Sequence, residues 1–194
     1  MKGTLNFYNK NAKEFCEETC SIDMSHCQNE FLKYFTQKAL ILDAGCGSGR
    51  DSKSFINKGH KVEAFDASKE ICEIATDYIG QRVICMRFEE IDYENKFDGI
   101  WASASLLHVS KDELPNVMTK MYIALKPQGI IYASFKYEET ENYRGDRRYS
   151  DFTETTVKEL FTNSGFEILE IFITSDGRKE KCDEKWVNVI AKRQ

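Results

Sequence analysis

The sequence predicts an α/β protein, a doubly wound sheet of about seven strands with helices on both faces. Two observations predict it. Apolar strand-like runs alternate with helix-like segments, and parallel strands need such crossovers. The last two β-rich runs, 166–174 and 185–191, are joined by a turn at 175–183 without a helix, so we expect the last strand to be antiparallel.

The individual elements follow from apolar periodicity and from helix and strand boundary signals. Phe31, Leu32 and Phe35 indicate an amphipathic helix that leads into the first strand. Ser68 is expected to cap a helix that ends at Gly80, and Thr153 begins another helix with a capping box. The expected strands are 39–44, 61–66, 81–88, 97–103, 130–137, 166–174 and 185–191, and the expected helices are 51–58, 69–79, 112–125 and 153–164.

Length and composition describe one soluble domain over residues 1–194, with 1–36 as a helical cover and 37–194 as the core. No apolar run reaches the ~20 residues of a membrane span, so we expect no membrane partner. The seven cysteines lack a CxxC pair and indicate reduced thiols in a cytoplasmic protein. The spacing of Cys16, Cys20 and Cys27 matches no zinc or iron–sulfur motif, so no metal site is expected.

The most informative stretch is a glycine-rich turn after the first strand. The apolar run 39–42 ends in Asp43, and Gly45, Gly47 and Gly49 follow before a helix opens at Arg50. Without Cβ atoms, such a turn lets a ligand approach the backbone closely. The pattern predicts a nucleotide-type site at the carboxyl edge of a parallel sheet.

The type of nucleotide follows from the acidic residues. Arg50 stands where the dinucleotide fingerprint GxGxxG has its third glycine, and the Asp43 carboxylate would repel a pyrophosphate. S-adenosylmethionine carries an ammonium, a sulfonium and no phosphate, and therefore suits an acid here. Asp66 lies 21 residues after Gly45, near the interval at which a second strand presents a carboxylate to ribose hydroxyls.

Four ordered motifs resemble those of class I S-adenosylmethionine-dependent methyltransferases, which have a Rossmann-like sheet. They are Asp43-Ala-Gly-Cys-Gly-Ser-Gly49, Phe65-Asp-Ala-Ser68, Phe97-Asp-Gly-Ile-Trp101 and Leu125-Lys-Pro-Gln-Gly-Ile-Ile131. The resemblance covers nearly the whole chain. It implies a methyltransferase whose cofactor is S-adenosylmethionine. At subfamily level the chain is similar to small bacterial proteins linked to tellurite resistance and to enzymes that esterify a carboxymethyl group on tRNA wobble uridine.

The resemblance also implies cofactor contacts. The methionine end would lie against Asp43 and the turn Gly45, Cys46, Gly47, Gly49 and Arg50, with Ser103 near the sulfonium. Asp66 would bind the ribose, and Ala67 and Ser68 would flank the adenine. Many family members have an Asp after the third strand, but Arg87 stands there, so Phe88 and Glu89 are the expected substitutes. Tyr8 would lie over the cofactor or, alternatively, pack as a hydrophobic staple.

The acceptor side is predicted from two segments. His108 follows the fourth strand and is a candidate for accepting a proton from the nucleophile, or it is a structural histidine. The loop 137–149 carries Arg144, Arg147 and Tyr149, which are candidates for substrate binding. Alternatively, its arginines pair internally with the loop's own acids, which are Glu138, Glu139, Glu141 and Asp146.

The expected reaction is methyl transfer to a small molecule or to an exposed group of a larger substrate. A modified tRNA wobble uridine is an alternative acceptor, although the net charge of −5 does not indicate nucleic acid as a partner. A non-catalytic module that keeps the cofactor fold is the rival function. We expect a monomer or a weak dimer.

Overall fold

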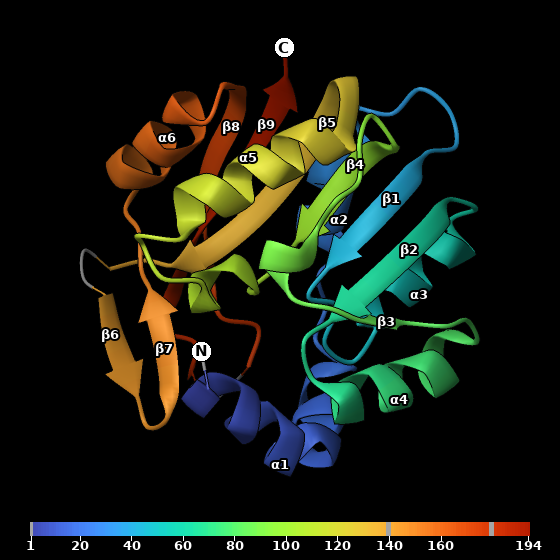
Figure 1. Cartoon of the computed structure of the whole chain (residues 1–194), viewed down its shortest axis with the longest axis vertical. Helices are drawn as coiled ribbons and strands as arrows, with labels where there is room; N and C mark the ends of the chain where they lie inside the picture. Colours follow the sequence, from blue (N-terminus) through green and yellow to red (C-terminus); the bar gives the residue numbers. More distant parts are fainter. Residues whose placement is uncertain (1, 139–140, 179–180) are drawn as a thin grey trace.

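The computed structural model describes residues 2–138, 141–178 and 181–194. A seven-stranded sheet forms its centre, in the order β3-β2-β1-β4-β5-β9-β8 (Figure 1). The strands are β1 (Leu40–Ala44), β2 (Lys61–Asp66), β3 (Ile84–Cys85), β4 (Phe97–Ala102), β5 (Leu125–Lys136), β8 (Phe166–Ser175) and β9 (Lys185–Arg193). The first five run parallel, whereas β9 is antiparallel to both β5 and β8. This confirms the predicted sheet and its antiparallel end.

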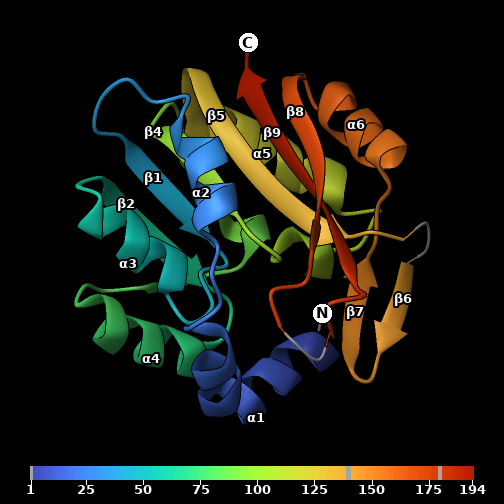
Figure 2. The same ribbon diagram turned by 180° about the vertical axis from the view of Figure 1, so that it is seen from behind.

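Helices cover both faces of the sheet. The helices are α1 (Lys2–Thr19), α2 (Ser25–Leu32), α3 (Arg50–Asn57), α4 (Lys69–Ile79), α5 (Leu114–Ala124) and α6 (Glu154–Asn163). Figure 1 shows α5 and α6 on one face, and Figure 2 shows α2 and α3 on the other. The N-terminal helix α1 lies across the carboxyl ends of the parallel strands, in contact with α4.

Local capping explains two of the helices. The Ser68 hydroxyl accepts a hydrogen bond from the Ile71 N–H at 3.3 Å, and α4 ends at Gly80 in a left-handed conformation. Thr153 and Thr156 form the reciprocal capping box of α6. The sequence therefore specifies both helix starts locally.

Aromatic packing joins the core to the carboxyl edge of the sheet. The Trp101 and Tyr132 rings, from the neighbouring strands β4 and β5, stack with centroids 3.9 Å apart and are fully buried. The Tyr132 hydroxyl donates to Asn188 of β9 at 2.7 Å. The Trp101 indole N–H donates to Asp51 at the start of α3, at 3.0 Å. These contacts fix β4, β5 and β9 relative to the start of α3, which follows the turn after β1.

Two expected strands have different boundaries. The third strand was predicted over 81–88, but β3 covers only Ile84–Cys85. The Val83 N–H bonds the Thr76 side chain, and the Arg87 N–H bonds the Glu90 carboxylate, so neither extends the ladder. The strand predicted over 130–137 begins earlier, at Leu125. The register between β4 and β5 shifts between Phe97 and Gly99, and this irregularity lets residues 126–129 belong to the strand.

The prediction that residues 137–149 form a loop is wrong for the residues that the structure describes. It contains a hairpin of β6 (Glu141–Arg144) and β7 (Arg147–Ser150), which pair antiparallel. Gly145 has φ +63° in the two-residue connection, a conformation that suits glycine. The hairpin places β7 against α1 (Figure 1).

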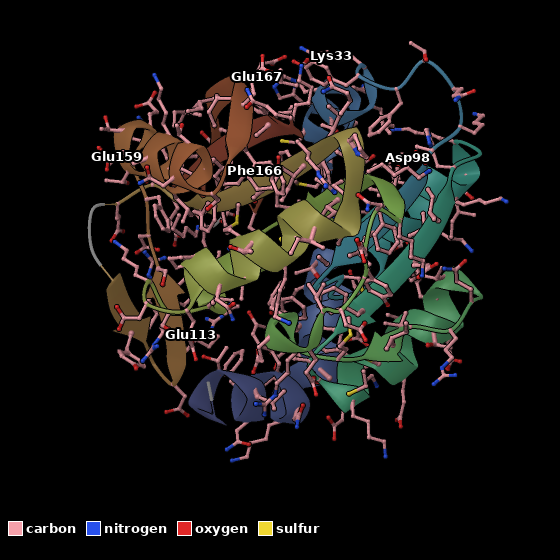
Figure 3. All side chains as sticks on the ribbon, turned by 45° about the horizontal axis from the view of Figure 1, so that its top comes forward. Lys33, Asp98, Glu113, Glu159, Phe166 and Glu167 are labelled. Carbon is pink, nitrogen blue, oxygen red and sulfur yellow. The ribbon has the colours of Figure 1, made fainter. Side chains whose placement is uncertain are left out.

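The end of the molecule opposite α1 carries surface charges. Figure 3 labels Lys33, Asp98 and Glu167 there. In the described parts of the chain no helix has the length and apolar character needed to cross a bilayer.

Candidate cofactor and acceptor site

A cavity of about 260 Å³ lies at the carboxyl ends of the parallel strands, under α1. Its volume is near the lower end of the ~300–1,000 Å³ usual for ligand pockets. Most residues predicted for the site line it. These are Tyr8, Asp43, Gly45, Cys46, Gly47, Arg50, Asp66, Ala67, Ser68, Phe88, Ser103, His108, Arg147 and Tyr149.

Three predicted residues do not line this cavity. Gly49 precedes α3 with φ +79°, and a Cβ there would lie 2.7 Å from the Ile79 side chain, so it serves helix packing. Glu89 faces Arg87 at 3.6 Å. Arg144 is paired with Glu138 at 2.9 Å, which agrees with the alternative that the arginines of the loop pair with its own acids. Of the other loop acids in that reading, Glu139 and the side chain of Glu141 lie outside the described residues.

The glycine turn approaches its neighbours closely. Gly45 has φ +77°, and a Cβ there would lie 2.6 Å from the Cβ of Ser105. The Gly45 and Cys46 N–H groups both donate to the Phe65 carbonyl at 2.9 Å, which fastens the turn to β2. Gly47 has φ +53°, and its missing Cβ leaves room next to the Phe15 ring of α1. The turn is a cradle that side chains would fill.

Asp66 ends β2 directly beside this turn. One carboxylate oxygen accepts the Gly47 N–H at 3.1 Å and the other accepts the Ser68 N–H at 3.0 Å. Burial raises the pKa of Asp66 despite these bonds. The carboxylate faces the cavity and retains lone pairs for hydroxyl donors, which suits a ribose.

Two carboxylates, Asp43 and Asp51, lie near each other at the turn, and the Arg50 guanidinium pairs with Asp51. Asp43 accepts from the Ser52 hydroxyl at 2.6 Å, and Asp51 accepts from Arg50 at 2.8 Å. Burial first, and then the charge of Asp51, raise the pKa of Asp43. A cation bound here would relieve that repulsion. The two carboxylates can accept hydrogen bonds from an ammonium, but they would repel a pyrophosphate.

His108 and Tyr8 form a hydrogen-bonded pair over the cavity. His108 Nδ1 lies 2.7 Å from the Arg148 carbonyl, which only accepts, so Nδ1 carries the proton of the neutral ring. The other nitrogen, Nε2, then accepts from the Tyr8 hydroxyl at 2.8 Å. Burial lowers the pKa of His108 to about 4, against the Arg148 hydrogen bond. Both ring nitrogens are therefore occupied.

A buried ion-pair network forms the far wall. Lys136 at the end of β5 lies 2.9 Å from Asp176, which also accepts the Trp186 indole N–H at 3.0 Å. Arg178 binds the same carboxylate in a bidentate manner, at 2.8 and 2.7 Å. Glu184 also contacts Lys136. This wall comes from the antiparallel end of the sheet.

Sequence reasoning missed several of the lining residues. Asp51 had a signal, because it follows Arg50 in the first turn of α3, where acids are favoured. Lys136 had one too, since it is a lone charge at the end of an apolar strand and needs a partner. That partner, Asp176, is 40 residues away and has no local signal.

The fold and the cavity together define a class. The sheet is doubly wound and ends with an inserted antiparallel strand, as the resemblance implied. A glycine turn follows β1, and both β1 and β2 carry an acid at or near the carboxyl end, Asp43 and Asp66. Residues 41–129 match the family model described as a methyltransferase domain. The family match and the fold support the resemblance to class I S-adenosylmethionine-dependent methyltransferases that the motifs predicted.

Known proteins with related sequence or fold differ in their substrates. The N-terminal Xaa-Pro-Lys N-methyltransferase 1-A of Xenopus laevis is 26% identical over 70% of this chain, and the match spans 65% of that protein, less than two thirds. A 1,6-didemethyltoxoflavin-N1-methyltransferase of Burkholderia thailandensis has TM-score 0.79 at 22% identity, over 98% of this chain and 85% of that chain. Magnesium protoporphyrin IX methyltransferase of Synechocystis has TM-score 0.76 at 14% identity, over 97% and 94%.

Proposed function

We propose that the protein transfers a methyl group from S-adenosylmethionine to a small, polar acceptor. The observation that carries this proposal is the pair Asp43 and Asp51, whose crowded charges at the glycine turn favour a bound cation. The Burkholderia and Synechocystis structures hold S-adenosylhomocysteine and S-adenosylmethionine, respectively. Neither tellurite nor tRNA enzymes are among the relatives named above, so those subfamily resemblances stay predictions.

Different residues of this chain would bind different parts of the cofactor. Asp43 and the backbone of Gly45 to Gly47 would hold the methionine end, and Asp66 would bind the ribose hydroxyls. The Phe88 ring, 5.3 Å from that of Phe65, would lie against the adenine. When bound, the cofactor supplies a methyl group whose bond to sulfur breaks, leaving the electron pair on sulfur, as its bond to the acceptor forms. The protein then has to orient the acceptor and take its proton.

The proton would leave through Tyr8. Since the lone pair of His108 Nε2 is occupied by the Tyr8 hydroxyl, an acceptor beneath α1 meets the tyrosine oxygen first. The acceptor proton would move to that oxygen while the tyrosine proton moves to Nε2. The other ring proton would stay on Nδ1, donated to the Arg148 carbonyl. Tyr8 is the group that contacts the acceptor, and His108 is the terminal base.

Calorimetry tests the cofactor assignment. S-adenosylhomocysteine should bind, and NAD should bind at least about tenfold more weakly, because its pyrophosphate would face Asp43 and Asp51. Heat with NAD and none with S-adenosylhomocysteine would overturn the proposed function.

Replacing Tyr8 tests the hydrogen-bonded pair without an acceptor. The tyrosine hydroxyl stabilises the neutral form of His108, so Tyr8→Phe should raise the His108 pKa above its value of about 4. Burial persists in the variant and should keep it below the ordinary value of about 6.5. A 15N NMR titration measures both the pKa and the tautomer. An unchanged pKa, or a proton on Nε2, would contradict the pair.

A further inference from the structure

Five arginine and lysine side chains line the cavity, and four of them have a carboxylate partner. Arg147 is the exception: it forms no ion pair with any described residue, and its Nε, which is buried, has no hydrogen-bond partner among them. The four neutralised side chains and their partners are Arg50 with Asp51, Arg87 with Glu89, Lys136 with Asp176, and Arg178 with Asp176.

Aromatic rings hold the Arg147 guanidinium in place. It lies over the Phe7 ring of α1 at 4.3 Å and over the Tyr149 ring of its own strand at 5.5 Å. Stacking of this kind uses the faces of the guanidinium and leaves its N–H edge for a ligand. A partly buried, unpaired arginine costs free energy that an anionic partner would offset.

Arg147 also acts on the proton-accepting pair. Its charge lowers the pKa of His108, in addition to the larger effect of burial, and it lies near the Tyr8 hydroxyl. An anion bound to Arg147 would cancel that repulsion, and the pKa of His108 would rise. The same contact would thus bind the acceptor and strengthen the base.

We propose that the methyl acceptor is a small organic anion whose carboxylate or similar group pairs with Arg147. Leu5, Leu107 and Val109 line the same cavity and suit an apolar body for this molecule. A guanidinium pairs with a carboxylate in a bidentate manner, so the anion fixes the direction in which the rest of the acceptor points. This substrate class rests on the proposed function for its reaction, but the binding of the anion does not need turnover.

Benzoate and its neutral analogue benzamide probe this site by calorimetry. With S-adenosylhomocysteine at saturation, benzoate should bind at least tenfold more tightly than benzamide. Arg147→Gln should reduce that preference to less than twofold, and Arg147→Lys should keep part of it. Arg148→Gln is the matched control, since Arg148 is adjacent but does not line the cavity, and it should retain the preference.

Each other outcome decides against the anion site. Equal affinity for the two probes, no binding of benzoate at millimolar concentration, or equal losses in both glutamine variants would overturn it. If Arg147→Gln weakens S-adenosylhomocysteine more than about twofold, the guanidinium belongs to the carboxylate of the cofactor instead. Titrations of the wild-type protein without S-adenosylhomocysteine separate the two proposals. If the protein prefers benzoate to benzamide but does not bind S-adenosylhomocysteine, only the proposed function is contradicted.

Discussion

Asp176→Asn should destabilise the protein by about 3 kcal/mol, the lower end of the ~3–5 kcal/mol lost when one member of a buried ion pair is removed. The side chains of Lys136 and Asp176 are 5% and 3% exposed, so the lysine charge would be left in a desolvated place. Arg178 and Trp186 would lose a charged acceptor as well. Glu184 still contacts Lys136, which is why we expect the lower value.

Urea denaturation measures this loss, and its pH dependence gives a second check. Burial opposes the charge of Asp176, but hydrogen bonds from Arg178 and Lys136 outweigh it and hold its pKa well below the ordinary value. A depressed carboxyl pKa adds stability above the unfolded value of about 3.9, and that stability disappears as the pH falls. The difference between wild type and variant should therefore shrink below about pH 4.

The control for this prediction is a surface pair. Glu167 lies 2.9 Å from Lys192, at the end of the molecule opposite α1 (Figure 3). Its side chain is 45% exposed, so Glu167→Gln should cost at most about 1 kcal/mol. Equal losses in the two variants would show that the Lys136 network is not a buried pair in solution.

Asp66→Ala should weaken S-adenosylhomocysteine by roughly 1.5–3 kcal/mol, the range for hydrogen bonds to a charged group. That corresponds to about 10- to 150-fold in the dissociation constant, which calorimetry resolves. The physical reason is the carboxylate at the end of β2, which would receive the ribose hydroxyls beside Gly47. Asp66→Asn keeps the shape of the side chain and should lose less.

The matched control lies on the neighbouring helix. Asp77 is exposed on α4, and Asp77→Ala should leave the affinity within about twofold. If Asp66→Ala binds as tightly as the wild type, the ribose lies elsewhere. Asp66 also accepts the Gly47 and Ser68 N–H groups, so its replacement also removes hydrogen bonds that stabilise the fold. Calorimetric unfolding of Asp66→Ala measures that loss of thermal stability separately from the loss of affinity.

The residues proposed to bind the cofactor could be predicted from the sequence because their signals are local. Gly45, Gly47 and Asp66 lie at the ends of consecutive strands, and strand–turn–helix spacing alone brings them together. The far wall, formed by the ion pairs around Lys136, has no such local signal. Lys136 and Asp176 meet only because β5 and β8 lie on either side of β9, a pairing between segments far apart in the chain.

The hairpin β6–β7 was missed for a different reason. Its strands are short and densely charged, so they lack the apolar alternation that predicts a strand. The Gly145-Asp146 turn was the available signal. The Tyr8–His108 bond joins residues 100 apart and depends on where α1 crosses the sheet, which sequence periodicity does not report.

The position of β9 between β5 and β8 has a consequence for biosynthesis. Chains leave the ribosome from the N-terminus, so β1, β2 and β4 can pair once residue 102 has emerged. The partner of β5 is not available until synthesis reaches the segment Lys185–Arg193. Since Trp186 and Asn188 of that segment line the cavity, the far wall is the last part of the pocket to form. A nascent chain can thus pair the strands that carry Gly45, Gly47 and Asp66 before the wall around Lys136 is complete.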